Sequence, residues 1–391
     1  MTDSPAGQAL PGAERRAAEA LLAHAWGERT EVRAAEAIWG RSHVVRLHLR
    51  SGRTAVLKRR GGLKHGRRAR GFGVELAALE CLNAMPAPVA PRLLGADPRA
   101  GILLMEDLAP GPSLADSLLA GTRERAQADL IAYARALGSL HAWSREQATG
   151  LARLRARHAP GVPLDPGWAG GVERGRGPFL AAAAGLGVAV AGAAAEMDEL
   201  APMLNAPGLP GLVHGDACPD NVRLTGGGCR VFDFERSGWG PVVLDAAYLL
   251  APFPSCWCFA SLPAGAAAPA VDAYRGCLAA AGVDLGPDWD AAVAAALAGW
   301  IIGWGEAIAG ALAEDREWGT TTMRPRLLAW LRNFTASAGG ARVLPRLQAL
   351  AGAMHDRLSS RWPGVPVPDY PALAPPGAAL ARVPGRWRPA Q

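Results

Sequence analysis

Residues 212–250 read LVHGDACPDNVRLTGGGCRVFDFERSGWGPVVLDAAYLL, and the rest of the chain is organised around this stretch. Asn221 follows Asp216 by five residues, and Asp233 lies beyond a glycine-rich turn. The glycines at 226–228 favour a hairpin between two short strands, because glycine accepts the positive φ values of a tight turn. The hairpin would bring Asn221 and Asp233 together, with Asp216 beside them. An amide oxygen next to two carboxylates predicts a site for magnesium and a nucleotide.

The spacing of these polar residues matches a known signature. Protein kinases carry H-R-D-L-x-x-x-N followed by D-F-G. Here His-Gly-Asp at 214–216 leads to Asn221 at the same spacing, and Asp-Phe-Glu at 233–235 stands where D-F-G would stand. The His-Gly-Asp form, with Pro219 ahead of Asn221, resembles the aminoglycoside phosphotransferase / choline kinase family of small-molecule kinases. The resemblance implies an α+β, protein-kinase-like two-lobe fold with a small β-rich N-lobe and a large, mainly helical C-lobe.

A lysine upstream extends the resemblance. The segment 54–58 reads TAVLK and is similar to the V-A-I-K strand of kinases. Lys58 would then contact the α- and β-phosphates of ATP. In kinases a glutamate on the next helix holds this lysine, and a helix expected over 74–83 offers Glu75 first and Glu80 second. An ordinary surface lysine and a glutamate that favours a helix N-terminus are the alternatives.

Two further parts of the nucleotide site follow from the resemblance alone. No G-x-G-x-x-G precedes the lysine, so the turn at 40–43, including Ser42, would cover the phosphates with ordinary backbone N–H donors. The apolar run at 101–108 predicts a buried strand that ends at the hinge between lobes. Backbone groups from Glu106 to Leu108 would bind the adenine edge.

These assignments predict an ATP-dependent phosphotransferase that moves the γ-phosphate to a hydroxyl of a small molecule, such as an aminoglycoside-like compound, an amino alcohol or a sugar. Asn221 and Asp233 would hold Mg²⁺, and Asp216 would accept or orient the hydroxyl proton of the acceptor. Asp245 would brace the loop that carries Asp216, although a plain first-turn helix acid fits the sequence equally well. The alternative function is a catalytically inactive, kinase-like nucleotide-binding protein.

The chain order predicts four parts. Residues 1–29 form an extension with a helix, 30–107 the kinase-like N-lobe, 108–362 the helical C-lobe, and 363–391 a loosely attached proline-rich tail. Within the C-lobe, the Pro/Gly/Arg-rich residues 150–177 lack periodicity and predict a long irregular connection.

Composition narrows the function classes. The chain has 391 residues and a formal net charge of +6, much of it in the basic cluster at 58–70. Glycines and the lack of interleaved aromatics favour a solvated loop over nucleic-acid binding there. The N-terminus lacks a signal-peptide pattern and no segment reads as a confident membrane span, so we expect a cytoplasmic protein. The pair Cys256 and Cys258 favours packing over a redox or metal role, and His141 favours a structural role.

Overall fold

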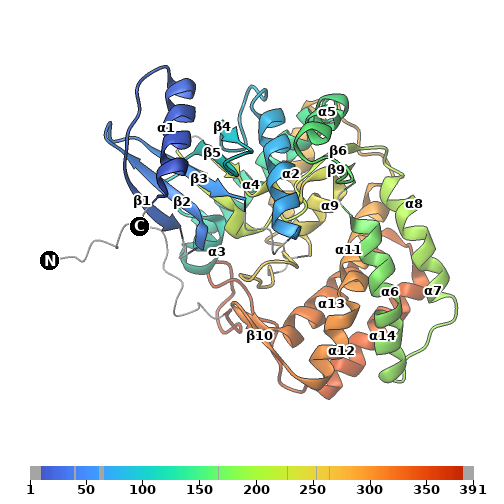
Figure 1. Cartoon of the computed structure of the whole chain (residues 1–391). Coiled ribbons are helices and arrows are strands. Elements are labelled where there is room, and N and C mark those ends of the chain that lie inside the picture. The colour runs from blue at the N-terminus through green and yellow to red at the C-terminus, as the bar shows by residue number, and fades with distance from the viewer. Residues whose placement is uncertain are drawn as a thin grey trace. The chain divides into compact units, whose positions relative to one another are not determined.

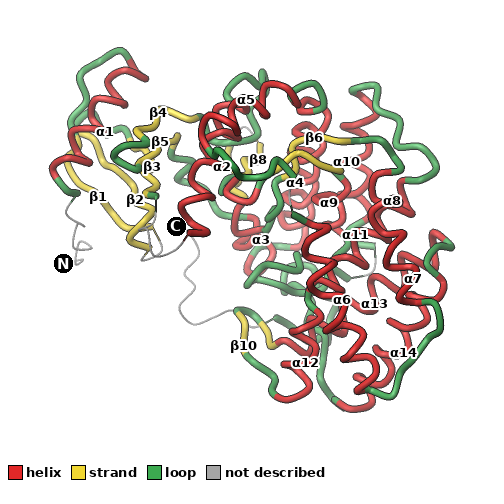
Figure 2. The backbone as a smooth tube through the Cα atoms, turned by 45° about the vertical axis from the view of Figure 1, so that its right-hand side comes forward, coloured by secondary structure: helices red, strands yellow, loops and turns green. Residues whose placement is uncertain are grey.

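The computed structural model describes residues 10–38, 41–60, 66–165, 167–226, 228–251, 253–263 and 265–381, with the backbone alone at 41–42 and 66–69. The chain divides into two compact units, which are described separately. The first comprises Met1–Ala109, Thr149–Leu164 and Arg230–Ser237. The second comprises Pro110–Ala148, Asp165–Cys229 and Gly238–Gln391. An antiparallel sheet dominates the first unit and helices dominate the second, which confirms the predicted kinase-like α+β fold (Figures 1 and 2).

The first unit is built on an antiparallel sheet in the order β1-β2-β3-β5-β4. Its strands are β1 (Val32–Ile38), β2 (Arg41–Leu49), β3 (Thr54–Arg59), β4 (Leu93–Asp97) and β5 (Ile102–Glu106). β3 and β5 agree with the strands predicted at 54–58 and 101–108. Strand β4 was missed, because its glycine and its short length hide the strand pattern.

Alternation along the strands decides which side chains enter the core of this unit. Val45 and Leu47 on β2, and Ala55 and Leu57 on β3, are fully buried beneath α1 (Gly12–Trp26), which lies along one face of the sheet (Figure 1). Successive strand residues point to opposite faces. Lys58, which follows Leu57, therefore points to the other face.

Helix α2 (Gly66–Leu82) begins earlier than predicted. The sequence indicated a basic loop as far as Gly73, but the described part of that segment is helical from Gly66. The prediction placed the helix start too late because glycines are typical of loops. Gly73 is needed for packing: a Cβ there would lie 2.1 Å from the carbonyl oxygen of His158, on α5 (Ala148–His158). Any larger residue would push the two helices apart.

The second unit is mainly helical (Figure 2). Its helices are α3 (Leu114–Ala120), α4 (Arg123–Ser144), α6 (Trp168–Gly185), α7 (Ala193–Glu196), α8 (Leu200–Asn205), α9 (Val243–Ala246), α10 (Ala268–Ala280), α11 (Trp289–Gly303), α12 (Gly305–Ala313), α13 (Met323–Ala341) and α14 (Pro345–Arg361). Its short strands are β6 (Pro210–Val213), β7 (Val222–Thr225), β8 (Gly228–Val231), β9 (Gly238–Pro241), β10 (Glu317–Trp318) and β11 (Thr321–Thr322), and the division between the units falls inside β8. The predicted hairpin is present, since β7 pairs with β8.

Two expectations about irregular structure are wrong. Residues 150–177 are largely helical, because they contain most of α5 and the start of α6. The segment after α14 is attached to the second unit as far as residue 381: Tyr370 is fully buried and its backbone N–H donates to the carbonyl of Ser261 at 3.1 Å. Tertiary contacts outweigh the glycine and proline content in both places. Residues 382–391 of the predicted tail lie outside the described residues.

Within the described ranges, no individual helix is both long enough and apolar enough for a membrane span. The pair α11 and α12, bent by 49° at their junction, meets the criterion by length and composition only.

Candidate functional site

In the first unit, Lys58 at the end of β3 lies among three carboxylates. Its Nζ is 2.5 Å from Oε2 of Glu75 on α2, in contact with Oδ1 of Asp233, and 3.6 Å from Oε2 of Glu235. The structure thus brings together three of the predicted site residues. It also shows which of the two proposed glutamates contacts Lys58. Glu75 does, whereas Glu80 contacts His158 Nε2 at 2.7 Å.

Burial and contact with Lys58 govern the ionisation of this cluster. Glu75 is 1% exposed, and its carboxylate shares a single ammonium group with Asp233 and Glu235. Burial raises the pKa of Glu75 to about 7, against the opposing pull of Lys58. Burial alone would lower the pKa of Lys58, but the three neighbouring acids raise it, so the ammonium stays charged. Glu75 therefore changes its charge near neutral pH, while Lys58 keeps its positive charge.

The raised pKa of Glu75 predicts a pH-dependent stability. The pKa of this group rises from 4.5 to about 7 on folding, so its contribution is present below pH 4.5 and is lost as the pH rises through 7. Glu75→Gln mimics the protonated form and removes this dependence. We expect urea unfolding in EDTA to show the variant gaining up to about 3 kcal/mol on the wild type across that window.

The exposed Glu124→Gln variant is the control, and its stability should follow the wild type at every pH. Parallel curves for the wild type and Glu75→Gln would show that the carboxyl group does not titrate in this range.

Asp233 adopts an unusual backbone conformation. Its φ of 71° and ψ of 54° lie in the left-handed region, and it directly precedes a short 3-10 helix (Phe234–Arg236) after β8. Asparagine and aspartate tolerate this region better than other non-glycine residues, but at some cost in energy. The conformation turns the chain sharply after the strand and places the Asp233 carboxylate at Lys58. Glu235, which the sequence reasoning missed, reaches the same lysine from this helix.

The predicted hinge segment ends β5 of the first unit. The backbone N–H of Glu106 donates to the carbonyl of Arg92 at 2.9 Å, so it is not free to bind a ligand. Asp107 accepts from Arg46 Nε at 2.7 Å and from the N–H of Ala109 at 3.1 Å, which fixes the chain around Leu108. The predicted phosphate-covering turn at 40–43 is wrong from Arg41 onward, because the backbone there belongs to β2. Gly40 and the side chain of Ser42 lie outside the described residues.

In the second unit, a buried aspartate anchors the loop that carries the predicted catalytic residue. Asp245 on α9 accepts from the backbone N–H of His214 at 2.6 Å and from that of Gly215 at 3.1 Å. Burial alone would raise the pKa of Asp245, but the hydrogen bond and charge of His141 and the contacts with His214 lower it. Asp245 is therefore held as a carboxylate that fixes the 214–221 loop, as the family resemblance implied.

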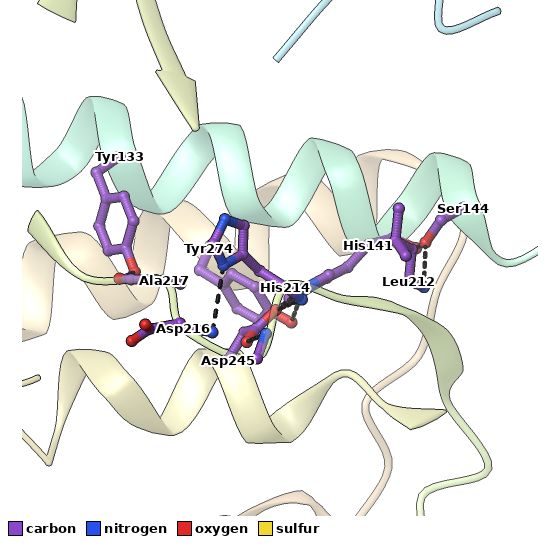
Figure 3. Close-up of polar contacts among 10 residues, drawn as sticks. Tyr133, His141, Ser144, Leu212, His214, Asp216, Ala217, Asp245 and Tyr274 are labelled. Carbon is purple, nitrogen blue, oxygen red and sulfur yellow. Dashed lines mark hydrogen bonds and ion pairs between the residues drawn. The ribbon is translucent and has the colours of Figure 1, made fainter. Parts of the chain in front are cut away.

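Side chains of one long helix, α4, form hydrogen bonds to the same loop and to the strand before it. Figure 3 shows Tyr133, His141 and Ser144 projecting from α4 toward the loop. Tyr133 donates to the carbonyl of Ala217 at 2.6 Å, and Ser144 Oγ accepts from the N–H of Leu212 at 2.9 Å. The third residue, His141, is fully buried between Tyr274 at 2.8 Å and Asp245 at 3.2 Å. The contacts of His141 fit the structural role expected from the sequence.

Asp216 is positioned by residues that sequence reasoning missed. Its Oδ1 accepts from Ser255 Oγ at 2.7 Å and from Cys218 Sγ at 3.0 Å. Ser255 in turn contacts the hydroxyl of Tyr248 at 2.8 Å, and burial raises the pKa of that tyrosine well above its usual value. Ser255 lies 39 residues from Asp216 in a segment without a recognisable motif. No local pattern could have indicated this contact.

Asn221 ends a 3-10 turn (Pro219–Asn221) and is 8% exposed. Its Nδ2 donates to the backbone carbonyl of Asp216 at 2.9 Å. This bond uses the amide nitrogen and fixes the orientation of the amide, so Oδ1 is the side-chain atom that could bind a cation. The predicted site residues thus form two groups: Asp216 and Asn221 in the second unit, and Lys58, Glu75 and Asp233 in the first.

Comparison with known proteins establishes the family. A model of the phosphotransferase enzyme family matches residues 33–307, so the chain belongs to that family. This confirms the predicted relationship to the aminoglycoside phosphotransferases and choline kinases. No curated protein matches the sequence.

Several solved structures are similar to the chain. An aminoglycoside phosphotransferase from Alicyclobacillus acidocaldarius has 17% identity and a TM-score of 0.43, with 84% of this chain and 93% of that chain covered. A choline kinase from Cryptosporidium parvum has 13% identity and a TM-score of 0.47, with 81% and 93% covered. A putative fructosamine-3-kinase from Thermobifida fusca has 21% identity and a TM-score of 0.45, with 80% and 98% covered.

Proposed function

We propose that the protein is an ATP-dependent phosphotransferase that moves the γ-phosphate of ATP to a hydroxyl group of a small molecule. The observation that carries this proposal is the buried Lys58–Glu75 ion pair with Asp233 in contact, within a chain of the phosphotransferase enzyme family. Phosphoryl transfer depends on neutralising phosphate charge and aligning the reactants. A lysine held rigidly between acids suits the first of these tasks.

Lys58 binds the α- and β-phosphates in this proposal, and Glu75 holds its ammonium group in place. Asn221 and Asp233 hold Mg²⁺, which neutralises charge on the β- and γ-phosphates when it is bound. The residues fit such an ion in two respects. Asn221 and Asp233 offer hard oxygen ligands, which Mg²⁺ prefers, and the Asp233 carboxylate lies beside the lysine proposed to bind the phosphates.

Asp216 orients the hydroxyl of the acceptor and accepts its proton as the bond to phosphorus forms. Carboxylates are weak bases, so orientation is the larger contribution. The hydrogen bond from Ser255 to Oδ1 fixes the direction of the carboxylate, and Asp245 fixes the loop that carries it. These contacts support a positioned group rather than a mobile surface acid.

The adenine edge is assigned to the backbone around Leu108. The N–H of Glu106 is already bonded to Arg92, so the next residues along the segment provide the polar groups. Ser42 remains the proposed phosphate-covering residue. A cytoplasmic location, where ATP is abundant and thiols stay reduced, suits both the reaction and the six free cysteines.

Calorimetry with ATP and with GTP tests the nucleotide part of the proposal. We expect the wild type to bind ATP with magnesium at least about tenfold more tightly than without it, because the metal screens the phosphates from the acids near Lys58. No binding of either nucleotide by the folded protein would contradict the proposal. Release of ADP on adding candidate aminoglycosides, amino alcohols or sugars would then identify the acceptor class.

The alternative is an inactive nucleotide-binding protein of the same fold. It predicts magnesium-dependent binding without ADP release for any acceptor. The hydrogen bonds that position Asp216 favour the enzyme, because a protein without a transfer step has no need of an oriented carboxylate in this loop.

A further inference from the structure

A second group of potential metal ligands lies in the second unit, next to the 214–221 loop. Cys218 Sγ, a carboxylate oxygen of Asp220 and Cys256 Sγ all lie within 4.8 Å of one another. Cys256 Sγ is 3.2 Å from Asp220 Oδ1 and 2.8 Å from Cys258 Sγ. Two thiols and a carboxylate from two chain segments therefore converge on one small space, and a third thiol, Cys258, lies next to Cys256.

The three thiols are shielded from solvent. Cys218 and Cys256 are each 2% exposed, and Cys258 is fully buried. Thiolates are soft ligands that select zinc and similar ions over magnesium, and carboxylate oxygens also bind zinc. The chemistry of this group therefore differs from that of the oxygen ligands Asn221 and Asp233.

A buried arginine supplies the second observation. Arg326 on α13 is fully buried, and its NH1 and NH2 donate to the carbonyls of Cys256 and Trp257 at 2.7 and 3.2 Å. Within the described ranges it forms no ion pair with a carboxylate, and its Nε has no hydrogen-bond partner. Its NH2 also donates to the carbonyl of Trp318 at 2.7 Å, and its guanidinium lies over the rings of Trp318 and Phe259, at 4.1 and 4.8 Å from their centroids. Negative charge on the nearby cysteine group would add an electrostatic partner to these contacts.

A bound divalent ion would bring the summed charge of its ligands and Arg326 to zero. Two thiolates and one carboxylate carry three negative charges, and a divalent ion leaves one, which Arg326 offsets. Asp220 also has no positively charged side chain as a partner within the described ranges. Its carboxylate accepts hydrogen bonds from the Cys256 thiol at 3.2 Å and from Trp257 Nε1–H at 2.8 Å.

We propose that Cys218, Asp220 and Cys256 bind a zinc-type divalent cation. Binding forms metal–sulfur and metal–oxygen bonds, and the thiol protons are released to solvent. The site ties the 255–258 segment to the 214–221 loop. It does not depend on the proposed phosphotransferase activity, and it is distinct from the magnesium site.

Metal binding would also change a hydrogen bond to Asp216. The Cys218 thiol donates to Asp216 Oδ1 at 3.0 Å, and a metal-bound thiolate can no longer donate. The Ser255 hydroxyl still donates to that oxygen, at 2.7 Å. A bound ion would therefore fix the segment that carries Ser255 while leaving that hydrogen bond intact.

Zinc content of the full-length chain tests the proposal without any assay of activity. The protein is reduced, freed of metal with a chelator, loaded with Zn²⁺ and desalted, and bound zinc is measured by atomic emission. We expect about one zinc per chain, and a thiolate-to-metal absorption band with Co²⁺. Cys218→Ser and Cys256→Ser should each weaken binding at least about tenfold.

Cys81→Ser is the matched control, because this buried cysteine lies in the first unit and should leave zinc binding unchanged. The zinc content of the wild type tests the proposal even if a cysteine variant fails to fold. A folded, fully reduced wild type that retains no zinc and shows no cobalt band would overturn the proposal. So would a purified chain in which Cys256 is found in a disulfide and zinc does not bind after reduction.

Discussion

Asp216→Asn is expected to lower the turnover number by about 10³-fold while leaving nucleotide affinity within a factor of about three. Asparagine keeps the size of the side chain and can still accept from Ser255 and Cys218 through its oxygen. It cannot take a proton, and it presents an amide where the acceptor hydroxyl needs a carboxylate. The loss therefore falls on the transfer step and not on binding of ATP.

Single-turnover measurement of ADP formation, with calorimetry for ATP affinity, separates the two effects. Asp272→Asn removes an exposed carboxylate of the same unit and should change neither quantity. Ser255→Ala should reduce turnover by only about tenfold, because it loosens the carboxylate without removing it. A turnover number near that of the wild type for Asp216→Asn would remove this residue from the proposed mechanism.

Local spacing explains why part of the candidate site could be predicted. Lys58 lies near the end of a strand in which buried and partly buried residues alternate, and Glu75 lies in the next helix. Each position depends on a short stretch of backbone geometry that the residue pattern reveals. The Lys58–Glu75 contact therefore follows once the strand and helix are recognised.

Contacts across long sequence separations could not be predicted in this way. Ser255 and Tyr248 reach the proposed catalytic group because the turn after α9 folds back, and no periodic pattern records that fold. The cysteine cluster has the same origin, since Cys218 and Cys256 come from separate segments. Considered alone, Cys256 and Cys258 favoured packing, because the partners that change their chemistry are distant in the sequence.

The errors in secondary structure have a related cause. The glycines before Leu76 suggested a loop, but in α2 they allow close approach of another backbone, as Gly73 does at His158. Residues 150–177 suggested an irregular connection, yet Arg155 is 4% exposed within α5, and its NH2 donates to the carbonyl of Ser237 at 2.7 Å. Packing and such long-range bonds stabilise helices that intrinsic propensity disfavours.

Asp233→Asn is expected to abolish the magnesium dependence of nucleotide binding and to lower turnover by about 10³-fold. Asparagine is the informative substitution because it tolerates the left-handed backbone at φ 71°, so the local fold is retained. The amide lacks the negative charge that holds the ion. The effect should therefore appear in titrations with magnesium and be weak in titrations without it.

Glu235→Gln separates the two roles that Asp233 could have. Both acids contact Lys58, but Glu235 is 3.6 Å away with a side chain 42% exposed, and the proposal gives it no part in metal binding. If Asp233 acts only by holding Lys58, the two variants should weaken ATP binding in the same manner, with and without magnesium. If Asp233 is a metal ligand, only Asp233→Asn should lose the response to magnesium. Retention of a full magnesium response in Asp233→Asn would rule out this ligand, and with it the arrangement in which Asp233 and Asn221 share one ion.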